Sequence, residues 1–486
     1  MDTDGGQHSS SSEATENLAW IRRYRESIDF SVARIPFSDS DQWVFHDNKS
    51  ALCHASGKFY SVRGYKCESA TRPAFYQPLI DQPEIGTQGF VVRRDGSGYE
   101  LLVQARTEPG NIGAVQFGPT IQATFSNYTT VHGGKRPLFL DYFHEPQRFG
   151  VRVIIDTTQP ELGSKFLRKW NRNLVIECPE LSEFSDPMFK WIPLCTLARF
   201  MQSDHLVNND ARLVVGLLAL EFGPSLFGHS GALLDRSISN SFKASSSKSF
   251  ADTGDVRQWM NQTRSLDARN VQEVPLNQLP GWQISEDEIH HQDGLFFSVI
   301  QVKVRAGDRE VADWDQPLIA TEHRGNIVLF CKEEDGVLNF LFRAAPEMGT
   351  ATGAELQPTI CFDNEGDTEI PNAIARLLND ENHVDRLRFE ASDEGGRFYQ
   401  CISQFDVLRL EDSVDPQLPD DYCWLTLAQI RELVRSSDFV SDESRSILSL
   451  ALAAVYANGH SSEPEIALNG VSFPTGDVRR GHECEP

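Results

Sequence analysis

The stretch QPLIDQPEIGTQGF at residues 77–90 is the first sign of an internal repeat, because its first four letters return at residues 316–319, 239 positions later. The same shift aligns PTI at 119–121 with PTI at 358–360. It also pairs Trp20 with Trp259, Pro36 with Pro275, Trp43 with Trp282, Gly86 with Gly325, Glu108 with Glu347, and Gly110 with Gly349. A constant shift over so many positions is not expected by chance, and self-similarity at a fixed spacing is typical of a duplicated unit. We infer two tandem copies of one domain.

The match extends, with small gaps, to the helical end of each copy. WIPLCTLARFMQSDHLVNNDAR at 191–212 is similar to WLTLAQIRELVRSSDFVSDESR at 424–445. Between the copies, residues 235–255 are rich in Ser and poor in large apolar residues, as flexible connectors are. We therefore expect a first domain at 16–234 and a second, diverged domain at 256–470, each of ordinary domain size. Residues 1–15 are expected to form a disordered leader, and residues 471–486 a polar tail.

Each copy shows the same order of local signals. An amphipathic helix with Trp20 or Trp259 comes first, and apolar runs of strand type such as GFVVRRD and YELLVQAR follow, separated by Gly-rich turns. A helical stretch with apolar residues spaced by three and four closes the copy. This order predicts an α+β fold in which helices flank a mixed β-sheet.

The overall charge limits the classes of partner. The 486 residues carry a formal net charge of -25, so nucleic acid and anionic membrane surfaces would repel the chain as a whole. Nine scattered cysteines without a CxxC pair argue against a disulfide framework or a zinc ribbon and fit a reducing cytoplasm. We expect a cytoplasmic protein that binds neither nucleic acid nor membrane.

The stretch TEPGNIGAVQFGPTIQATFSNYTTVHGG at 107–134 contains too many polar residues for an ordinary buried strand. The second copy serves as a control, because it keeps the apolar positions and loses many of the polar ones. Arg106, Asn111, Asn127 and Tyr128 are matched there by Ala345, Thr350, Gly366 and Asp367. Since the second copy folds without these polar residues, we predict that the first copy bears the functional site.

A second run, FLRKWNRNLVIE at 166–177, shows the same contrast with FYQCISQFDVLR at 398–409. Arg168, Lys169, Asn171 and Arg172 are matched by Gln400, Cys401, Ser403 and Gln404. A cluster of cations in an acidic protein is suited to an anionic ligand, since Arg and Lys donors fit phosphate oxygens. A solvated strand face would give the same pattern, and the residues alone leave both readings open.

Other motifs give little support to common enzyme classes. The sequence has no Walker loop and no GxGxxG, GxSxG or HExxH motif. EDEIHH at 286–291 places His291 beside a Gly turn in the position of His54, so we expect no metal site there. Trp43 and Trp282 follow polar or Pro-containing loops, where each is a candidate for stacking on a nucleotide base and also for the core.

The strings HASGKFYSVRG, QPLIDQPEIGTQGF, QARTEPGN, PTIQATFSNYTTVHGG, FLRKWNRN and SLDARNVQEVPLNQLPGW resemble those of the NDP-hexose 2,3-dehydratase family. The resemblance covers nearly the whole chain outside the leader and the connector. It implies two domains similar in fold to Nudix hydrolases but without the Nudix metal box, and a homodimer. It also implies a dTDP-4-keto-6-deoxyglucose substrate in deoxysugar biosynthesis, from which water is removed across C2 and C3, with no cofactor and no metal.

The implied chemistry assigns roles to the polar residues of the first copy. The C4 ketone acidifies the C3 hydrogen, so a base removes that proton, donors hold the enolate oxygen, and an acid assists the C2 hydroxyl. The candidates for base and acid are Glu108, His132 and Tyr128. The candidates for substrate binding are Trp43, Arg106, Ser126, Asn127, Thr129, Thr130, Ser164, Arg168, Lys169, Asn171, Arg172, Asn173 and Trp282.

Two other functions are weighed against this one. The second copy reads APEMGTATGAELQPTICFDNEGD at 345–367, which departs from the family pattern and suggests a noncatalytic nucleotide-sugar-binding protein as one alternative. A Nudix-like diphosphate hydrolase is the other, and it would require a divalent metal and a cluster of carboxylates on one helix. The sequence does not reveal the nucleotide base, the final deoxysugar or the oligomeric state.

Overall fold

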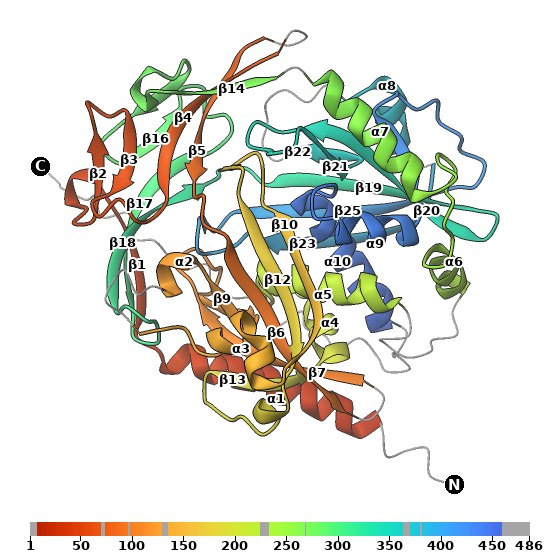
Figure 1. Cartoon of the computed structure of the whole chain (residues 1–486), viewed down its shortest axis with the longest axis horizontal. Coiled ribbons are helices and arrows are strands. Elements are labelled where there is room, and N and C mark those ends of the chain that lie inside the picture. The colour runs from red at the N-terminus through yellow and green to blue at the C-terminus, as the bar shows by residue number, and fades with distance from the viewer. Residues whose placement is uncertain are drawn as a thin grey trace, which may run out of the picture.

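The computed structural model describes residues 7–69, 73–95, 98–128, 135–223, 233–267, 269–362, 370–379 and 382–458. This part of the chain is a mixed α/β structure with four sheets, each of which contains both parallel and antiparallel neighbours (Figure 1). The two-part layout expected from the repeat is confirmed, because the strands β1 to β13 recur in the same order as β14 to β26.

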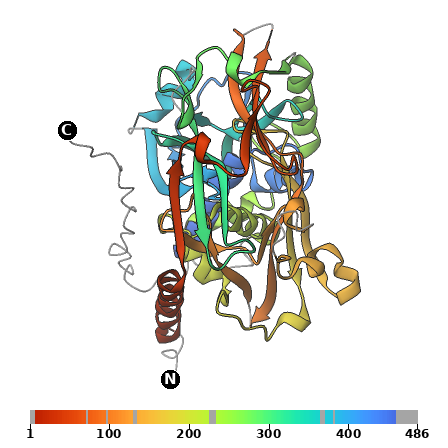
Figure 2. The ribbon, with the colours of Figure 1, turned by 90° about the vertical axis from the view of Figure 1, so that its left-hand side faces the viewer.

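The two small sheets exchange one strand between the copies. The first contains β2 (Trp43–His46), β3 (Ala51–His54), β4 (Ser61–Glu68), β5 (Phe75–Asp81) and β11 (Phe166–Leu167), and β14 (Asn270–Val274) of the second copy pairs with β4. The second contains β15 (Trp282–Ile284), β16 (Glu288–His291), β17 (Ser298–Ala306), β18 (Asp313–Ala320) and β24 (Phe398–Tyr399), and β1 (Phe30–Ile35) pairs with β17. Figure 2 shows β1, in red, beside the green strands of the second copy.

The tryptophans of the repeat strengthen this exchange. The indole Nε1 of Trp43 donates to the carbonyl of Asp315 at 2.9 Å, and the indole Nε1 of Trp282 donates to the carbonyl of Tyr76, also at 2.9 Å. Tyr76 and Asp315 are themselves 239 positions apart, so the two bonds form one reciprocal contact between the copies. Matched tryptophans in a single register therefore hold the two halves together.

Each copy also has a large sheet. In the first copy it contains β6 (Gly86–Asp95), β7 (Gly98–Thr107), β8 (Val115–Gly118), β9 (Ile121–Ala123), β10 (Arg152–Pro160), β12 (Trp170–Glu177) and β13 (Phe189–Pro193). In the second it contains β19 (Gly325–Glu334), β20 (Val337–Pro346), β21 (Ala354–Pro358), β22 (Ile360–Phe362), β23 (His383–Ser392), β25 (Ile402–Leu410) and β26 (Tyr422–Leu425). The central strands β6 and β12 pair in parallel and are mostly buried, as expected of strands that are covered on both faces.

The repeated PTI triplet has a structural cause in these large sheets. The hydroxyl of Thr120 accepts a hydrogen bond from the amide of Val91 at 2.9 Å and donates to the carbonyl of Leu102. Thr359 makes the same two contacts with Phe330, at 3.0 Å, and Leu341. A buried hydroxyl needs such partners, so the threonine recurs in both copies.

Helices fill the space between the large sheets and cover their outer edges. They are α1 (Gln7–Ser27), α2 (Phe125–Tyr128), α3 (Leu140–His144), α4 (Leu194–Phe200), α5 (Asn209–Phe222), α6 (Leu233–Ser241), α7 (Thr253–Leu266), α8 (Asn372–Ala375), α9 (Leu427–Arg435) and α10 (Asp442–Asn458). Helices α5 and α10 lie side by side near the centre (Figure 1). A Cβ on Gly216 would collide with Ser449, so the close approach of the two helices requires a glycine there. None of the described helices has the length and apolarity that a membrane span requires.

Two segments expected to lack structure contain helices. Helix α6 (Leu233–Ser241) extends into the Ser-rich connector. Ile238 in this helix and Phe242 just after it are 4% and 6% exposed because they pack in the main core. Helix α1 begins at Gln7, inside the predicted leader, and Ala14 is 4% exposed in the same core. Apolar residues spaced by four along a helix supply a buried side that composition alone does not reveal.

Candidate active site

One cavity lies where the first copy's large sheet meets a loop of the second copy. The space between its walls, including the part open to solvent, is about 380 Å³. Its walls come from the start of β6, from β9, from the β10–β12 connection, from α5 and from the second-copy loop 393–397. Its charged lining residues are Glu161, Lys169, Asp210, Glu394 and Arg397, and its amide-bearing lining residues are Gln82, Gln88, Gln122 and Asn171.

Glu161 and Lys169 titrate closer to neutrality in this cavity than in water. Burial raises the pKa of Glu161 to about 7, and its Oε1 accepts a hydrogen bond from Asn171 Nδ2 at 2.7 Å. Burial lowers the pKa of Lys169 to about 8, although the nearby Glu161 acts in the opposite direction, and its Nζ donates to the carbonyl of Glu84. Groups of this kind exchange protons readily near neutral pH.

Asp210, at the start of α5, adds a third buried acid. Burial, followed by the charges of Glu394 and Glu161, raises its pKa well above the ordinary value. With its amide nitrogen turned toward the carboxylate, Gln88 donates to Asp210 at 3.0 and 3.2 Å. Helix α5 is held at this end by Asn208, whose side chain caps the amide of Ala211 at 2.9 Å.

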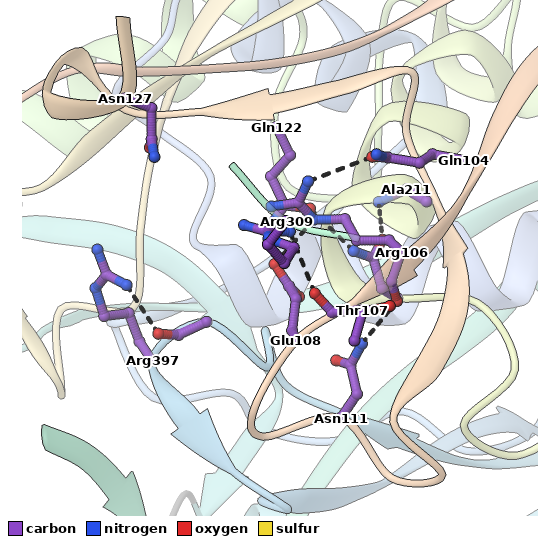
Figure 3. A network of polar contacts seen from close by, with 12 residues as sticks. Gln104, Arg106, Thr107, Glu108, Asn111, Gln122, Asn127, Ala211, Arg309 and Arg397 are labelled. Carbon is purple, nitrogen blue, oxygen red and sulfur yellow. Dashed lines mark hydrogen bonds and ion pairs between the residues drawn. The ribbon is translucent and has the colours of Figure 1, made fainter. Parts of the chain in front are cut away.

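Glu108 is part of a polar cluster that adjoins the cavity (Figure 3). Its Oε1 accepts hydrogen bonds from Arg106 Nε and from the cavity residue Gln122, both at 2.9 Å. Its Oε2 is buried and has no hydrogen-bond partner among the residues described. Arg309 reaches this cluster from the second copy and donates to the carbonyl of Thr107 at 3.2 Å. An ion-paired carboxylate with one uncommitted oxygen is suited to accept a proton.

The second copy docks on the first through two glycines. The amide of Gly110 donates to the carbonyl of Gly395 at 2.8 Å, and the amide of Gln400 donates to the carbonyl of Gly110 at 2.9 Å. A Cβ on Gly110 would collide with the carbonyl of Phe398. The close contact therefore fixes the loop 393–397, and with it Glu394 and Arg397, at the cavity.

Arg397 is held in place at the cavity wall. Its guanidinium lies over the ring of Tyr60 at 4.1 Å, its Nε contacts Gln82 Oε1 at 3.3 Å, and its Nη1 donates to the carbonyl of Gly396 at 2.8 Å. In Figure 3 the guanidinium and the side chain of Asn127 point toward one another. Lys169 and Arg397 together give the cavity two cations from the two copies.

Some of the residues predicted for the site lie in or beside this cavity. Lys169 and Asn171 line it, Arg106 and Glu108 adjoin it, and the side-chain amide of Asn173 lies 2.8 Å from that of Gln88. Ser126, Asn127 and Tyr128 lie on α2, where the cavity residue Thr124 bonds to the side chains of Ser126 at 2.9 Å and Asn127 at 2.8 Å. Burial raises the pKa of Tyr128 to about 12, and its hydroxyl donates to the carbonyl of Ala123.

The structure places other predicted residues away from the cavity. Trp43 and Trp282 are buried between the small sheets, Arg168 is exposed, and Arg172 is engaged by Asp156 through hydrogen bonds of 2.8 and 2.6 Å. Ser164 lies in the first-copy loop that docks on the second copy, where its carbonyl accepts from Gln77 at 2.9 Å. Thr129, Thr130 and His132 lie outside the described residues.

Four charged cavity residues do not appear among the sequence candidates, namely Glu161, Asp210, Glu394 and Arg397. Glu161 lies five residues before the run at 166–177, and Asp210 lies within the repeated segment 191–212. Their counterparts Asp393 and Glu443 are also acids, so a contrast between the copies does not single them out. Glu394 and Arg397 belong to the second copy, which the contrast between copies excluded. Among the described residues, no group of three or more His, Cys, Asp and Glu side chains is arranged to hold a metal ion.

The fold and the cavity define a duplicated mixed α/β protein in which acidic and basic side chains line a cavity between the two copies. A model of the NDP-hexose 2,3-dehydratase family matches residues 14–218 and 253–451. The chain therefore belongs to the NDP-hexose 2,3-dehydratase family, and as a nucleotide-sugar dehydratase it is a hydro-lyase.

Three relatives match over almost the full length of the chain. The chain is 33% identical to the dTDP-4-dehydro-6-deoxy-alpha-D-glucopyranose 2,3-dehydratase of Saccharopolyspora spinosa, with 92% of each chain covered. It is 33% identical to the enzyme of that name from Amycolatopsis orientalis, with 90% of each covered. It is 34% identical to the one from Streptomyces violaceoruber, with 88% of this chain and 95% of the relative covered.

Proposed function

We propose that this protein removes water across C2 and C3 of dTDP-4-keto-6-deoxyglucose and releases a 3,4-diketo-2,6-dideoxy sugar nucleotide for deoxysugar biosynthesis. The names of the relatives support the substrate. The observation that carries the proposal is the cavity, because it gathers acids and a lysine whose pKa values lie near neutrality. Dehydration beside a ketone consists of proton transfers, and such groups perform them.

The base in this proposal is Glu108. Its Oε2 is buried without a hydrogen-bond partner in the described part of the chain, and Arg106 keeps the side chain in place. When Glu108 removes the C3 proton, the electron pair moves to the C4 oxygen, where donors such as Gln122 and Asn127 stabilise the enolate. Tyr128, with its raised pKa, acts as a donor rather than as a base. His132 stays a candidate outside the described residues.

The two cations of the cavity bind the anionic part of the substrate. Lys169 and Arg397 approach from opposite copies, and a diphosphate offers several oxygens to both. Arg168, which is exposed, and Arg172, which is hydrogen-bonded to Asp156, were also predicted for this role and are not assigned it in this proposal. Lys169 therefore carries the role that the sequence assigned to the whole basic run.

Several finer expectations belong to the proposal. We propose a Nudix-like relationship for each copy, domains at 16–234 and 256–470, a homodimer and a cytoplasmic location. The noncatalytic binding protein is the alternative, since the second copy has lost side chains that the first retains. Light scattering on the purified protein tests the dimer: a mass near twice 54.6 kDa is expected, and a monomer contradicts it.

Incubation with the 4-keto sugar nucleotide, followed by mass spectrometry, tests the reaction. The expected product has lost one water, and the rate is the same with and without a chelator. Binding without loss of water would favour the noncatalytic alternative. Cleavage of the diphosphate that stops with chelator would favour a Nudix-type hydrolase. Cytidine-, guanosine- and uridine-linked substrates in parallel identify the nucleotide base.

A further inference from the structure

Glu394 is an acid of the second copy placed in the first copy's cavity. It lies on the loop 393–397 between β23 and β24, which the contacts of Gly110 with Gly395 and Gln400 hold against the first copy. The corresponding residue of the first copy is Leu162, which precedes Phe166 by the same four positions as Glu394 precedes Phe398. The carboxylate is therefore a feature of the second copy alone.

The carboxylates of Glu394 and Glu108 both lie close to Gly396. A Cβ placed on Gly396 would collide with Oε1 of Glu394 and lie 3.6 Å from Oε1 of Glu108. Two buried carboxylates this close do not both ionise easily, so the pair tends to keep one proton. Glu108 is ion-paired to Arg106 at 2.9 Å, which makes it the charged member. The proton is therefore retained by Glu394.

The titration of Glu394 agrees with this geometry. Burial, and then the charge of Glu108, raises the pKa of Glu394 to about 7, although Arg397, Arg106 and Lys169 oppose the shift. A carboxylic acid that keeps its proton near neutral pH is suited to donate it to a leaving hydroxyl.

We propose that Glu394 is the general acid of the dehydration, so that the second copy completes the active site of the first. The inference rests on the proposed function. Glu108 takes the C3 proton, and the C3–H electron pair forms the C4 enolate. The enolate then forms the C2–C3 double bond while the C2–O bond breaks, and the proton of Glu394 joins the departing oxygen to give water. The C3 enol finally becomes the ketone as its hydroxyl proton is lost and C2 gains one.

Glu394→Gln in the full chain separates the two proton transfers. The amide has the same shape but no acidic proton, whereas Glu108 is untouched. In D₂O the variant is expected to exchange the C3 hydrogen of the substrate within a few-fold of the wild-type rate. Its release of water is expected to fall on the order of 10²- to 10³-fold, the usual contribution of general acid catalysis. Glu347→Gln, in the second-copy position of Glu108, is the matched control and should change neither rate by more than a few-fold.

A 2-deoxy-2-fluoro analogue of the 4-keto sugar nucleotide gives an independent readout. Fluoride leaves without protonation, so Glu394→Gln should eliminate it at a rate close to that of wild type. A purely structural defect would slow fluoride and water release alike, and that result would overturn the proposal.

The outcomes for the function and for this inference differ. If wild-type protein releases no water, the proposed function fails. If wild type releases water and Glu394→Gln does so at the same rate, the role of Glu394 fails while the function stands. Should Glu394→Gln melt far below wild type, Glu394→Asp takes its place, because it keeps the acid but shortens its reach. Water release from Glu394→Asp is expected to fall while C3 exchange stays within a few-fold of the wild-type rate, and a loss of C3 exchange as large as the loss of water release would contradict the assignment.

Discussion

The first copy's cavity and the same place in the second copy share a backbone but differ in chemistry. Gly110 docks on the carbonyl of Gly395, and Gly349 docks on the carbonyl of Gly163 at 2.7 Å, so the glycine contacts are reciprocal. The side chains differ: Lys169, Gln88 and Gln122 are matched by Cys401, Ile327 and Cys361. Glu394 and Arg397 are matched by Leu162 and Lys165. The duplicated scaffold therefore fixes where two loops meet, whereas a few substitutions decide which of the two places carries the charged and amide side chains of the cavity.

Glu108 and Glu347 give the largest expected difference between the copies. Glu108→Gln removes the base, and kcat is expected to fall on the order of 10²- to 10⁴-fold, the range typical of acid–base groups. Glu347→Gln is expected to leave kcat within a few-fold, because its copy lacks the lysine and glutamines of the first cavity. Steady-state rates of water loss, measured by mass, check both. Equal losses in the two variants would remove the functional distinction between the copies.

Lys169 and Cys401 form the second pair. Lys169→Cys gives the first copy the second copy's residue and removes a cavity cation. Charge-assisted contacts contribute roughly 1.5–3 kcal/mol, so kcat/KM should fall on the order of 10- to 100-fold. Cys401→Ser, at the matched position, should change kcat/KM less than threefold. If titration calorimetry with dTDP gives the same affinity for Lys169→Cys and wild type, Lys169 does not bind the diphosphate.

The pH profile tests Glu394, whose counterpart at the same place in the second copy is Leu162. Glu394 must be protonated to act, and its pKa is about 7, so kcat/KM should fall about tenfold per pH unit above that value. The charged groups facing it are Glu108, Arg106, Lys169, Arg397, Glu161 and Asp210.

Two variants decide which acid is responsible for this limb of the profile. Glu394→Gln should lose the decline at high pH, since an amide does not titrate. Glu161→Gln should keep it, although the pKa of Glu161 is also about 7. The opposite pattern would assign the titration to Glu161.

Much of the architecture could be predicted from the repeat. The shared register of Trp43 with Trp282 and of Thr120 with Thr359 indicated two copies, and the structure shows identical contacts at each pair. The exchange of β1 and β14 could not be predicted, because each copy has the same strand and pairing within a copy satisfies the pattern equally well. Which copy each strand joins depends on the path of the chain between the copies, and amino-acid composition does not predict that path.

The candidate site was predicted only in part, because a side chain that the second copy lacks can be either a ligand contact or a solvated surface residue. Residues present in the first copy and lost in the second included Lys169 and Asn171, which line the cavity. They also included Arg168, which is exposed, because loss of a side chain does not distinguish a ligand contact from a solvated face. Glu394 was missed because it was gained by the second copy in place of Leu162. Glu394 reaches the first copy's cavity because the two copies dock through Gly110, and the sequence does not show this docking.

The smallest expected difference between the copies is in stability, and it comes from Glu355 and Gln116. They occupy the same position of the repeat, and Glu355 is 2% exposed. Burial, and then the charge of Glu443, raises the pKa of Glu355 to about 8. Because this folded-state pKa exceeds the unfolded value, the contribution of Glu355 to stability is complete below about pH 4.5 and is lost as pH rises through about 8.

Glu355→Gln, which copies the first copy's residue, removes this titration. At pH 5 both forms carry a neutral side chain, so their melting temperatures should agree within about a degree. At pH 8.5 wild type must bury a charge, and the variant should melt a few degrees higher while its rate of water loss is unchanged. Calorimetry at the two pH values measures the difference. An equal shift at both pH values would mean that shape rather than charge distinguishes Glu355 from Gln116.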